Sequence, residues 1–292
     1  AYSTFLDSQT GWYEIKYPKN ISEEKLEEMQ AFMDEVARLI EESDSLEAYE
    51  RLKEMVDIES FIQMFLLDEI SNEADLNRAS TFYFVADDGK LYAGPVWDYD
   101  RSMGNVKSSQ YELLDCFTVG LGEKLFRSPY FRQDVADSYN ARYRKLLDHY
   151  ETSYIDEQKA KINASIGMDT IRWGDEDANR YTIFNAKYDT FDEGVAYLKD
   201  YFGIRHGLVE DLINNPDKYH QVEFVNTGAT TEYVSQRLWV LHGEEIPEEI
   251  MDYLAQKYES DVWRTEDGRE YQRAPVLEDV RLLSGKEDMA KE

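Results

Sequence analysis

Residues 81–100, TFYFVADDGKLYAGPVWDYD, carry the clearest β-strand signal of the chain. Two runs rich in aromatic and β-branched residues flank a turn sequence at residues 87–89, so the stretch predicts a hairpin of residues 81–85 and 91–96. Pro95 has no backbone N–H to donate to a neighbouring strand. The second strand should therefore end at Pro95 or lie at the edge of a sheet.

Helical periodicity occurs on both sides of this hairpin. Ser22 is the expected N-cap of a helix whose apolar stripe covers residues 26–40. A helix from about residue 57 to residue 70 is apolar on more than one face, so we place it in the core. Residues 121–213 follow a helical pattern again, with a capping box at residues 190–193.

The helical pattern ends at a strong helix-stop signal at residues 214–217. Short strand-like runs and one helical stretch then follow, at residues 222–225, 238–241, 247–258 and 280–283. They predict a small α+β module. The expected organisation is a domain of residues 1–216, mostly helical with a β-hairpin, a module of residues 217–285 and a tail of residues 286–292, which makes the fold class α+β.

The composition limits the classes of function. With 32 basic and 61 acidic side chains the formal charge is −29, which excludes nucleic acid as a direct partner because phosphate binding needs a basic surface. The chain is 42% apolar and 14% aromatic, unlike a disordered acidic tail. No run approaches the roughly 18–20 apolar residues of a membrane-spanning helix. The single cysteine, Cys116, can form neither an internal disulfide nor a zinc site alone.

Two aspartates lie on either side of the hairpin. Asp75 follows the buried helix and Asp98 follows the second strand, so the hairpin can return the chain and face both carboxylates into one space. Paired carboxylates repel unless a cation lies between them, and Mg²⁺ is the hard cation held by carboxylates and substrate phosphates. Such a pair suits phosphoryl transfer. The alternative is that both are ordinary loop residues in a chain with 61 acidic side chains.

The aromatic residues beside Asp98 make it the more suggestive of the two. Trp97 and Tyr99 flank the carboxylate, and bulky aromatic neighbours predict a partly desolvated site. A carboxylate in such surroundings is costly without a partner.

Several segments carry a resemblance to a known family: residues 12–18, 58–62, 69–75, 80–83, 89–100 and 126–132. They resemble the CotH family of atypical, spore-coat-type protein kinases. The resemblance covers about residues 1–214. Its most specific part is Gly94-Pro95-Val96-Trp97-Asp98-Tyr99-Asp100.

The resemblance implies a remote protein-kinase-like fold, ATP and Mg²⁺ as cofactors, and phosphorylation of Ser or Thr in surface or coat proteins. By motif, Asp75 matches the catalytic-loop aspartate of the family and Asp98 matches its metal-binding aspartate. Asp100 is a further candidate metal ligand, and Asn105 is a site neighbour. A second metal ligand would be sought in the loop that contains Asn72 and Asn77.

Two departures from the family pattern bear on activity. Glu73 stands where family members often have Asn, which affects the expected metal geometry. A Gly-rich loop before a Lys-bearing strand does not occur at the start of the chain. We therefore expect residues 1–292 to be the carboxy-terminal part of a longer protein whose amino-terminal lobe lies upstream, with the fragment inactive alone.

The tail resembles the Listeria–Bacteroides repeat, a small β-grasp-like module of bacterial surface proteins. The similar segments are residues 222–226, 243–247, 263–268 and 275–280. This resemblance implies an exported, extracellular or cell-surface bacterial protein, with the spore coat as one such location.

Two other interpretations stay open. The protein can be a non-catalytic surface or scaffold protein that keeps the fold as a pseudokinase, with the tail as an adhesion or spacer module. Asp98 and Asp100 can alternatively bind calcium for stability alone.

Overall fold

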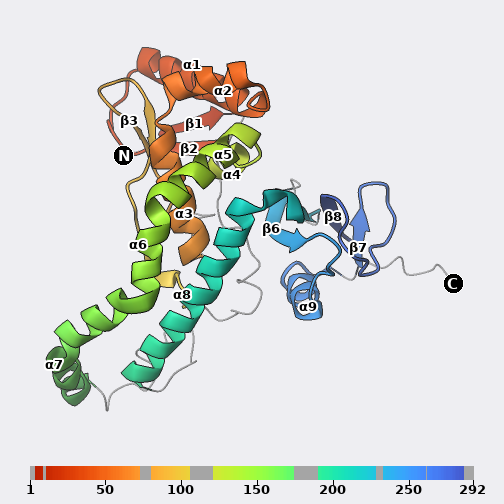
Figure 1. The fold of residues 1–292 in the computed structure, drawn as a ribbon. Helices are drawn as coiled ribbons and strands as arrows, with labels where there is room; N and C mark the ends of the chain where they lie inside the picture. The colour runs from red at the N-terminus through yellow and green to blue at the C-terminus, as the bar shows by residue number, and fades with distance from the viewer. Residues whose placement is uncertain are drawn as a thin grey trace. The chain divides into compact units, whose positions relative to one another are not determined.

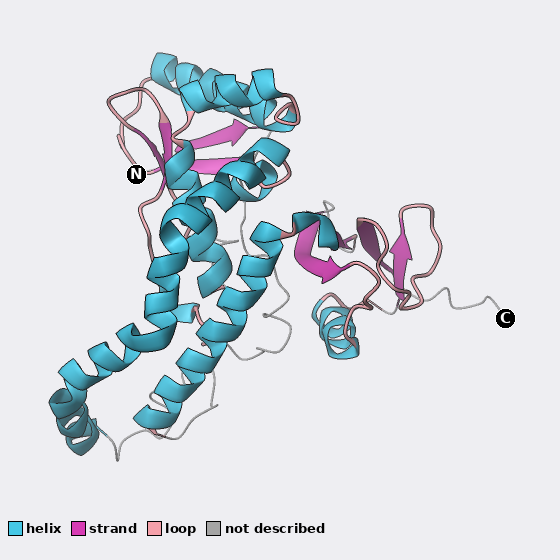
Figure 2. Ribbon diagram, viewed as in Figure 1, coloured by secondary structure: helices cyan, strands magenta, loops and turns pink. Residues whose placement is uncertain are grey.

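The computed structural model describes residues 4–8, 11–72, 80–105, 121–173, 190–227, 233–260 and 262–285. Its residues form two compact units. The first unit takes in residues 1–69, 73–100 and 118–148, and the second takes in residues 70–72, 101–117 and 149–292. Helices predominate, and the described strands form three small sheets (Figures 1 and 2). The α+β fold class expected from the sequence is confirmed.

The first unit combines helices with two hairpins. Its described strands are β1 (Thr4–Ser8), β2 (Gly11–Ile15), β3 (Tyr83–Val85) and β4 (Leu91–Ala93). Its helices are α1 (Glu23–Glu41), α2 (Leu46–Met55), most of α3 (Ile58–Ser71), α4 (Leu121–Leu125), α5 (Pro129–Ser138) and most of α6 (Arg144–His149), with a π-helical turn η3 (Tyr139–Tyr143) and most of a 3₁₀ turn η1 (Tyr99–Arg101).

Helices α1 and α3 lie where the sequence predicts them. The Ser22 hydroxyl accepts a hydrogen bond from the Lys25 amide at 3.2 Å and so caps α1. Most apolar residues on α3 are buried, as expected for a helix that is apolar on more than one face. Phe65 of α3 stacks on Phe126, with ring centroids 4.4 Å apart, and meets Phe131 edge-on. This aromatic cluster forms part of the core of the first unit.

The predicted hairpin is present, and its strands are shorter than expected. Strands β3 and β4 pair antiparallel from Tyr83↔Ala93 to Val85↔Leu91. The pairing ends beyond β4 because Gly94 has a φ of +123° and Pro95 has no N–H. The expected end of the strand near Pro95 is confirmed.

The sequence analysis did not identify α2 or the β1–β2 hairpin. Helix α2 buries only Ala48, Tyr49 and Leu52, too few apolar positions to stand out in a charged segment. Tyr49 is anchored through its hydroxyl, which donates to Asp134 on α5 at 2.8 Å.

The second unit holds two long helices and the tail module. Its helical elements are the π-helical turn η4 (Tyr150–Tyr154), α7 (Ile155–Trp173), α8 (Phe191–Asn214), the 3₁₀ turn η5 (Pro216–Lys218) and α9 (Glu248–Lys257). The expected capping box opens α8, with Thr190 and Glu193 bonding to each other's backbone N–H. Helix α8 ends at the predicted stop.

The tail module is a four-stranded sheet with one helix, the small α+β architecture that the sequence predicts. Its strands are β5 (Tyr219–Asn226), β6 (Tyr233–Leu241), β7 (Val262–Thr265) and β8 (Val280–Gly285). They lie in the order β6-β5-β8-β7, with the central pair β5 and β8 parallel and the outer pairs antiparallel. The predicted boundary between residues 216 and 217 stays a prediction.

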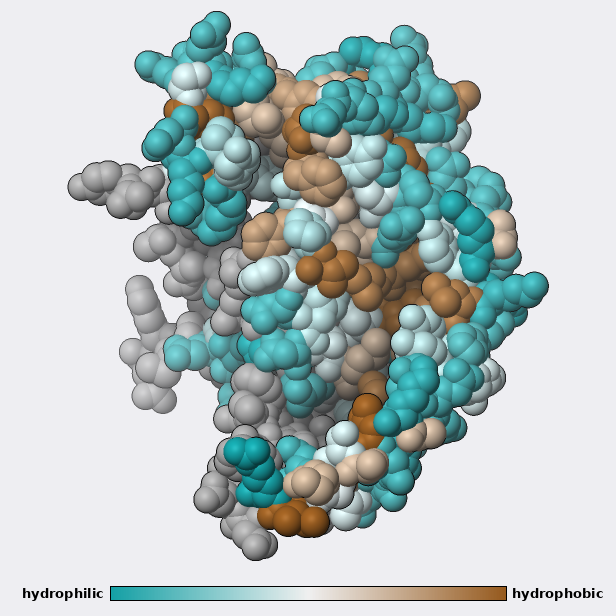
Figure 3. All heavy atoms as spheres, turned by 90° about the vertical axis from the view of Figure 1, so that its left-hand side faces the viewer, coloured by the Kyte–Doolittle hydropathy of each residue, from teal (hydrophilic) through white to brown (hydrophobic). Residues whose placement is uncertain are grey.

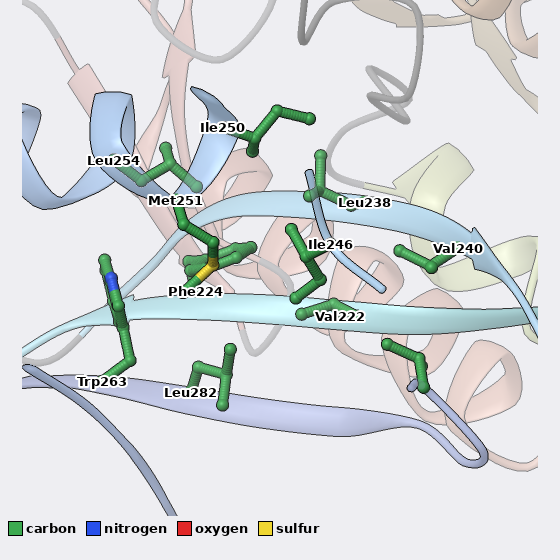
Figure 4. Packing of buried hydrophobic residues seen from close by; sticks show 11 residues of the cluster. Val222, Phe224, Leu238, Val240, Ile246, Ile250, Met251, Leu254, Trp263 and Leu282 are labelled. Carbon is green, nitrogen blue, oxygen red and sulfur yellow. The ribbon is translucent and has the colours of Figure 1, made fainter. Parts of the chain in front are cut away.

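One hydrophobic cluster joins the sheet to α9 (Figure 4). Ile250, Met251 and Leu254 of α9 belong to the same cluster as the strand residues Phe224 and Leu238. Phe224 is fully buried and meets Trp263 of β7 edge-on, with ring centroids 5.0 Å apart. Apolar burial therefore holds this module together.

Figure 3 shows the hydropathy of one face of the molecule. On the face drawn in Figure 3, hydrophilic residues cover most of the area and apolar residues gather in smaller patches between them. Within the described parts of the chain, the helices are too short or too polar to cross a membrane.

Candidate functional site

Asp98 lies on an exposed turn that leaves the hairpin. It follows β4 by five residues and directly precedes η1. Its φ is +65°, in the left-handed region that Asp adopts more readily than most residues. Asp98 is exposed and Trp97 is 59% exposed, so the partly desolvated carboxylate expected from the flanking aromatics is not found. An exposed carboxylate is open to a metal ion.

The turn is anchored to the end of α3. The Tyr99 hydroxyl donates a hydrogen bond to the Asp68 carboxylate, which is buried. Glu69, the next residue, is buried as well. Because Tyr99 lies between Asp98 and Asp100, this hydrogen bond fixes the segment that presents both carboxylates. Asp100 lies in η1 and is exposed.

The sequence analysis missed Asp68. The sequence signal that could have identified Asp68 is the acidic pair Asp68-Glu69 at the end of an otherwise apolar helix. A carboxylate buried there is costly unless a hydrogen-bond donor satisfies it.

Aromatic packing holds the base of the hairpin. Phe82 meets Trp97 edge-on, with ring centroids 6.2 Å apart. Tyr83 stacks on Phe61 of α3 at 5.9 Å and accepts a hydrogen bond from the Leu121 amide at 3.4 Å. Burial raises the pKa of Tyr83 far above its usual range.

Asp75 lies outside the described residues, as do Glu73 and Asn77. The expected approach of Asp75 to Asp98 therefore stays a prediction. In the described stretches, no three His, Cys, Asp or Glu side chains form a group that could hold a metal ion. The exposed carboxylates of Asp98 and Asp100 are nonetheless the oxygen ligands that Mg²⁺ and Ca²⁺ prefer.

Asn72 precedes Asp75 by three residues and belongs to the second unit. Its φ is +52°, and its side chain is buried. Its Nδ2 donates to the Tyr201 hydroxyl on α8 at 3.0 Å. The Nδ2 half of the Asn72 amide is therefore bonded within the protein. The role of Asn72 as a second metal ligand stays a prediction.

The segment after η1 also packs in the second unit. The Met103 amide donates to the Ser71 carbonyl at 2.6 Å, and the Tyr197 hydroxyl of α8 donates to the Gly104 carbonyl at 3.5 Å. The Asn105 amide donates to the Ser102 carbonyl at 3.0 Å and closes a turn. This backbone hydrogen bond fixes the position of Asn105.

Comparison with protein families gives a match over most of the chain. The model of the family described as CotH kinase protein matches residues 4–209. This region takes in Asp75, Asp98, Asp100 and most of α8, and it ends before the tail sheet. Comparison with curated proteins gave no match.

Proposed function

The chain belongs to the CotH kinase protein family, and we propose that it transfers the γ-phosphoryl group of Mg-ATP to Ser or Thr side chains of protein substrates. The family match over residues 4–209 carries this proposal. The exposed Asp98 at the end of the hairpin supports it, because the Tyr99–Asp68 hydrogen bond holds that segment in place. Preorganised placement of this kind is what phosphoryl transfer requires of a protein.

Each aspartate has a separate role in the proposal. Asp75 orients the substrate hydroxyl and accepts its proton, while the hydroxyl oxygen bonds to the γ-phosphorus and the bond to the ADP oxygen breaks. Asp98 holds Mg²⁺, with Asp100 as the neighbouring candidate ligand. When bound, Mg²⁺ supplies positive charge that offsets the negative charge of the phosphates.

The charge of the chain gives the metal a second role. ATP is an anion and the chain carries a formal charge of −29, so the protein repels free ATP at long range. A divalent cation reduces the charge of the nucleotide. We therefore expect the affinity for ATP to depend steeply on Mg²⁺.

The test is transfer of labelled phosphate from ATP to a surface or coat protein by the full-length protein. Transfer should require Mg²⁺, stop with a chelator and yield phosphoserine or phosphothreonine on mass spectrometry. Asp75→Asn should lower the rate by at least about 100-fold, since it removes the proton acceptor. Absence of transfer by the wild-type protein with either Mg²⁺ or Mn²⁺ would overturn the proposal.

We extend the proposal to the tail module and to location. The sheet order β6-β5-β8-β7, with a parallel central pair, supports a β-grasp-like repeat in residues 217–285. Modules of this kind imply an exported protein at the bacterial surface or in the spore coat. Fractionation of cells and spores tests this, and recovery of the protein only inside the cell would contradict it.

A pseudokinase scaffold is the second candidate, and Glu73 favours it because the family often has Asn there. A kinase must bind Mg-ATP, whereas a scaffold need not. Calorimetry on the full-length protein separates the two, since a heat of binding that requires both ATP and Mg²⁺ supports the kinase.

A further inference from the structure

Two histidines face each other at one end of the tail sheet. His220 lies on β5, and His242 directly follows β6. The His220 Nε2 atom lies 2.8 Å from the His242 Nδ1 atom, and the two ring centroids are 5.1 Å apart. One ring donates the N–H of this hydrogen bond, and the other accepts it through a nitrogen lone pair. We call these two residues the histidine pair.

The pairing of β5 with β6 brings the two rings together. His220 lies opposite Val240 in the antiparallel register, and the His242 amide donates to the Lys218 carbonyl at 2.7 Å. His242 is therefore the diagonal neighbour of His220 on the same face of the sheet. Because residues two apart on a strand share a face, His220 lies on the face of Val222, which belongs to the hydrophobic cluster. The backbone of the folded sheet thus sets the distance between the two rings.

A carboxylate orients the His220 ring. The Asp279 Oδ1 atom lies 3.6 Å from His220 Nδ1. It also accepts a hydrogen bond from the Gln221 amide at 2.8 Å, which holds the carboxylate in place. A negative charge on this side favours a proton on Nδ1, so the lone pair of His220 Nε2 faces His242. Histidines that bind metals are arranged in this way, with one ring nitrogen turned to a carboxylate and the other to the ion.

We propose that the histidine pair binds a divalent transition metal ion that prefers imidazole ligands, such as Zn²⁺. His220 Nε2 and His242 Nδ1 are the protein ligands, and water completes the coordination. In the part of the chain that the structure describes, no third His, Cys, Asp or Glu joins this pair in a metal-binding group. The site should therefore be weaker than structural zinc sites with four protein ligands. It is independent of the proposed kinase function, whose Mg²⁺ ligands are carboxylates.

The rings need only a small adjustment to hold an ion. Zn–N bonds of about 2.0–2.1 Å at a tetrahedral angle place two ligand nitrogens about 3.4 Å apart, so the rings separate by about half an ångström. His242 is exposed and the His220 side chain is 20% exposed, so an ion reaches both nitrogens from solvent. His242 moves its proton from Nδ1 to Nε2, which leaves both ligands as neutral imidazoles.

Calorimetric titration of the untagged chain with Zn²⁺ tests the site, with millimolar Mg²⁺ present to occupy sites made of carboxylates alone. His242→Gln should lower the affinity for Zn²⁺ by more than about 10-fold, because loss of a ligand costs more than loss of an outer partner. The matched control is His149→Gln, since His149 is exposed and bonded to Ser153 at 2.9 Å. It should keep the wild-type affinity. Equal affinity in wild type and His242→Gln would overturn the proposal.

Two further changes test the chemistry of the site. Asp279→Asn keeps the oxygen that accepts from the Gln221 amide and removes the charge, so it should lower the affinity about 10-fold. Unchanged affinity would overturn the orienting role of Asp279. Lowering the pH from about 7.5 to about 5.5 should also weaken binding, because a protonated imidazole cannot bind a metal. Constant affinity over this range would indicate a site made of carboxylates and overturn the histidine pair.

NMR of the histidine rings locates the ion directly. The chain has four histidines, and Zn²⁺ should shift the ring nitrogen signals of His220 and His242 while those of His149 and His206 stay in place. Mg²⁺ should shift none of the four, because it prefers oxygen ligands. Shifts confined to His149 or His206 would contradict the proposal. A wild-type chain with neither a heat of Zn²⁺ binding nor a shift at the pair overturns it, whether or not the chain transfers phosphate.

Discussion

The tail sheet and the segments around the candidate site are stabilised by different interactions. In the tail sheet, apolar residues from four strands and one helix form a continuous cluster around Phe224. In the site segments, residues 70–72 and 98–105, the backbone is left-handed at several positions, and the polar side chains of Ser71 and Asn72 are buried whereas Asp98 and Asp100 are exposed. There, single hydrogen bonds join residues far apart in sequence, such as Asn72 and Tyr201.

Because of this difference, the tail sheet and the site segments should respond differently to substitution. Burial of apolar surface is non-directional, so the sheet tolerates small shifts and fails mainly through loss of buried volume. A hydrogen bond depends on distance and angle, so the site segments lose their shape when one partner changes. Substitutions of buried apolar residues in the sheet should therefore cause the largest losses of unfolding free energy, whereas loss of one hydrogen-bond partner in the site segments should change local geometry at a smaller cost in stability.

The largest stability effect is expected in the tail sheet. Phe224→Ala should lower its unfolding free energy by about 3–5 kcal/mol, because it opens a cavity beside Trp263 in a fully buried site. Urea denaturation followed by tryptophan fluorescence measures the loss. Leu277→Ala is the control, since Leu277 of the same module is 60% exposed. Equal losses in the two variants would show that apolar burial does not hold the sheet.

The next effect concerns Gly104. Gly104→Ala should cost about 1–3 kcal/mol from overpacking against Tyr201, in addition to the cost of its left-handed backbone. Gly268→Ala isolates the backbone cost, because Gly268 has a φ of +82° and open space at its Cβ position. Thermal denaturation compares them. Similar losses in both variants would mean that the close contact of Gly104 with Tyr201 contributes nothing.

A smaller effect is expected where helix α8 begins. Thr190→Ala should cost about 1 kcal/mol, because it removes the side-chain half of the capping box. Ser45→Ala provides the comparison, since Ser45 precedes α2 and makes no capping hydrogen bond through its side chain. Chemical denaturation should show a loss for Thr190→Ala alone. If both variants lose the same amount, the capping box does not stabilise α8.

The smallest effect is a pH dependence of the unfolding free energy that arises from Glu59 of α3. Burial raises the pKa of Glu59, but hydrogen bonds from Tyr143, Gln63 and Arg142 outweigh burial and hold the pKa below its usual value. A carboxyl with a lowered pKa in the folded state stabilises the protein above its unfolded pKa. That contribution disappears as the pH falls through the folded value.

Denaturation between pH 6 and pH 3 measures this contribution, which should be below about 1 kcal/mol because Glu59 is partly exposed. Wild-type protein should lose it in the acid range, and Glu59→Gln should lack that part of the pH dependence. Parallel curves for the two proteins would exclude Glu59 as the source.

The same contrast explains what the sequence predicted. Apolar periodicity located α1, α3 and the strands of the tail module, because burial imposes that pattern on regular elements. The turn residues and Pro95 located the β3–β4 hairpin and its end. The positions of Asp75 and Asp98 on either side of this hairpin made both candidates, and the family resemblance implied a role for each. The family match confirms the family over residues 4–209, and the roles of both aspartates stay predictions.

Other features could not be predicted because they depend on contacts between distant residues. The Tyr99–Asp68 hydrogen bond spans 31 positions and the Asn72–Tyr201 hydrogen bond spans 129. No local sequence pattern predicts either hydrogen bond. The exposure of Asp98 was mispredicted for the same reason, since its aromatic neighbours in sequence do not enclose it in the fold.

The most direct measurement is the rate of Mg²⁺-dependent phosphate transfer by Asp98→Asn in the full-length protein. Asn also tolerates a left-handed φ, so the variant should keep its melting temperature within about 2 °C of wild type. Loss of the carboxylate should slow transfer by at least about 100-fold, whereas Asp87→Asn, in the exposed turn of the same hairpin, should keep the wild-type rate. Full activity of a folded Asp98→Asn variant would contradict the role of Asp98 as the metal ligand.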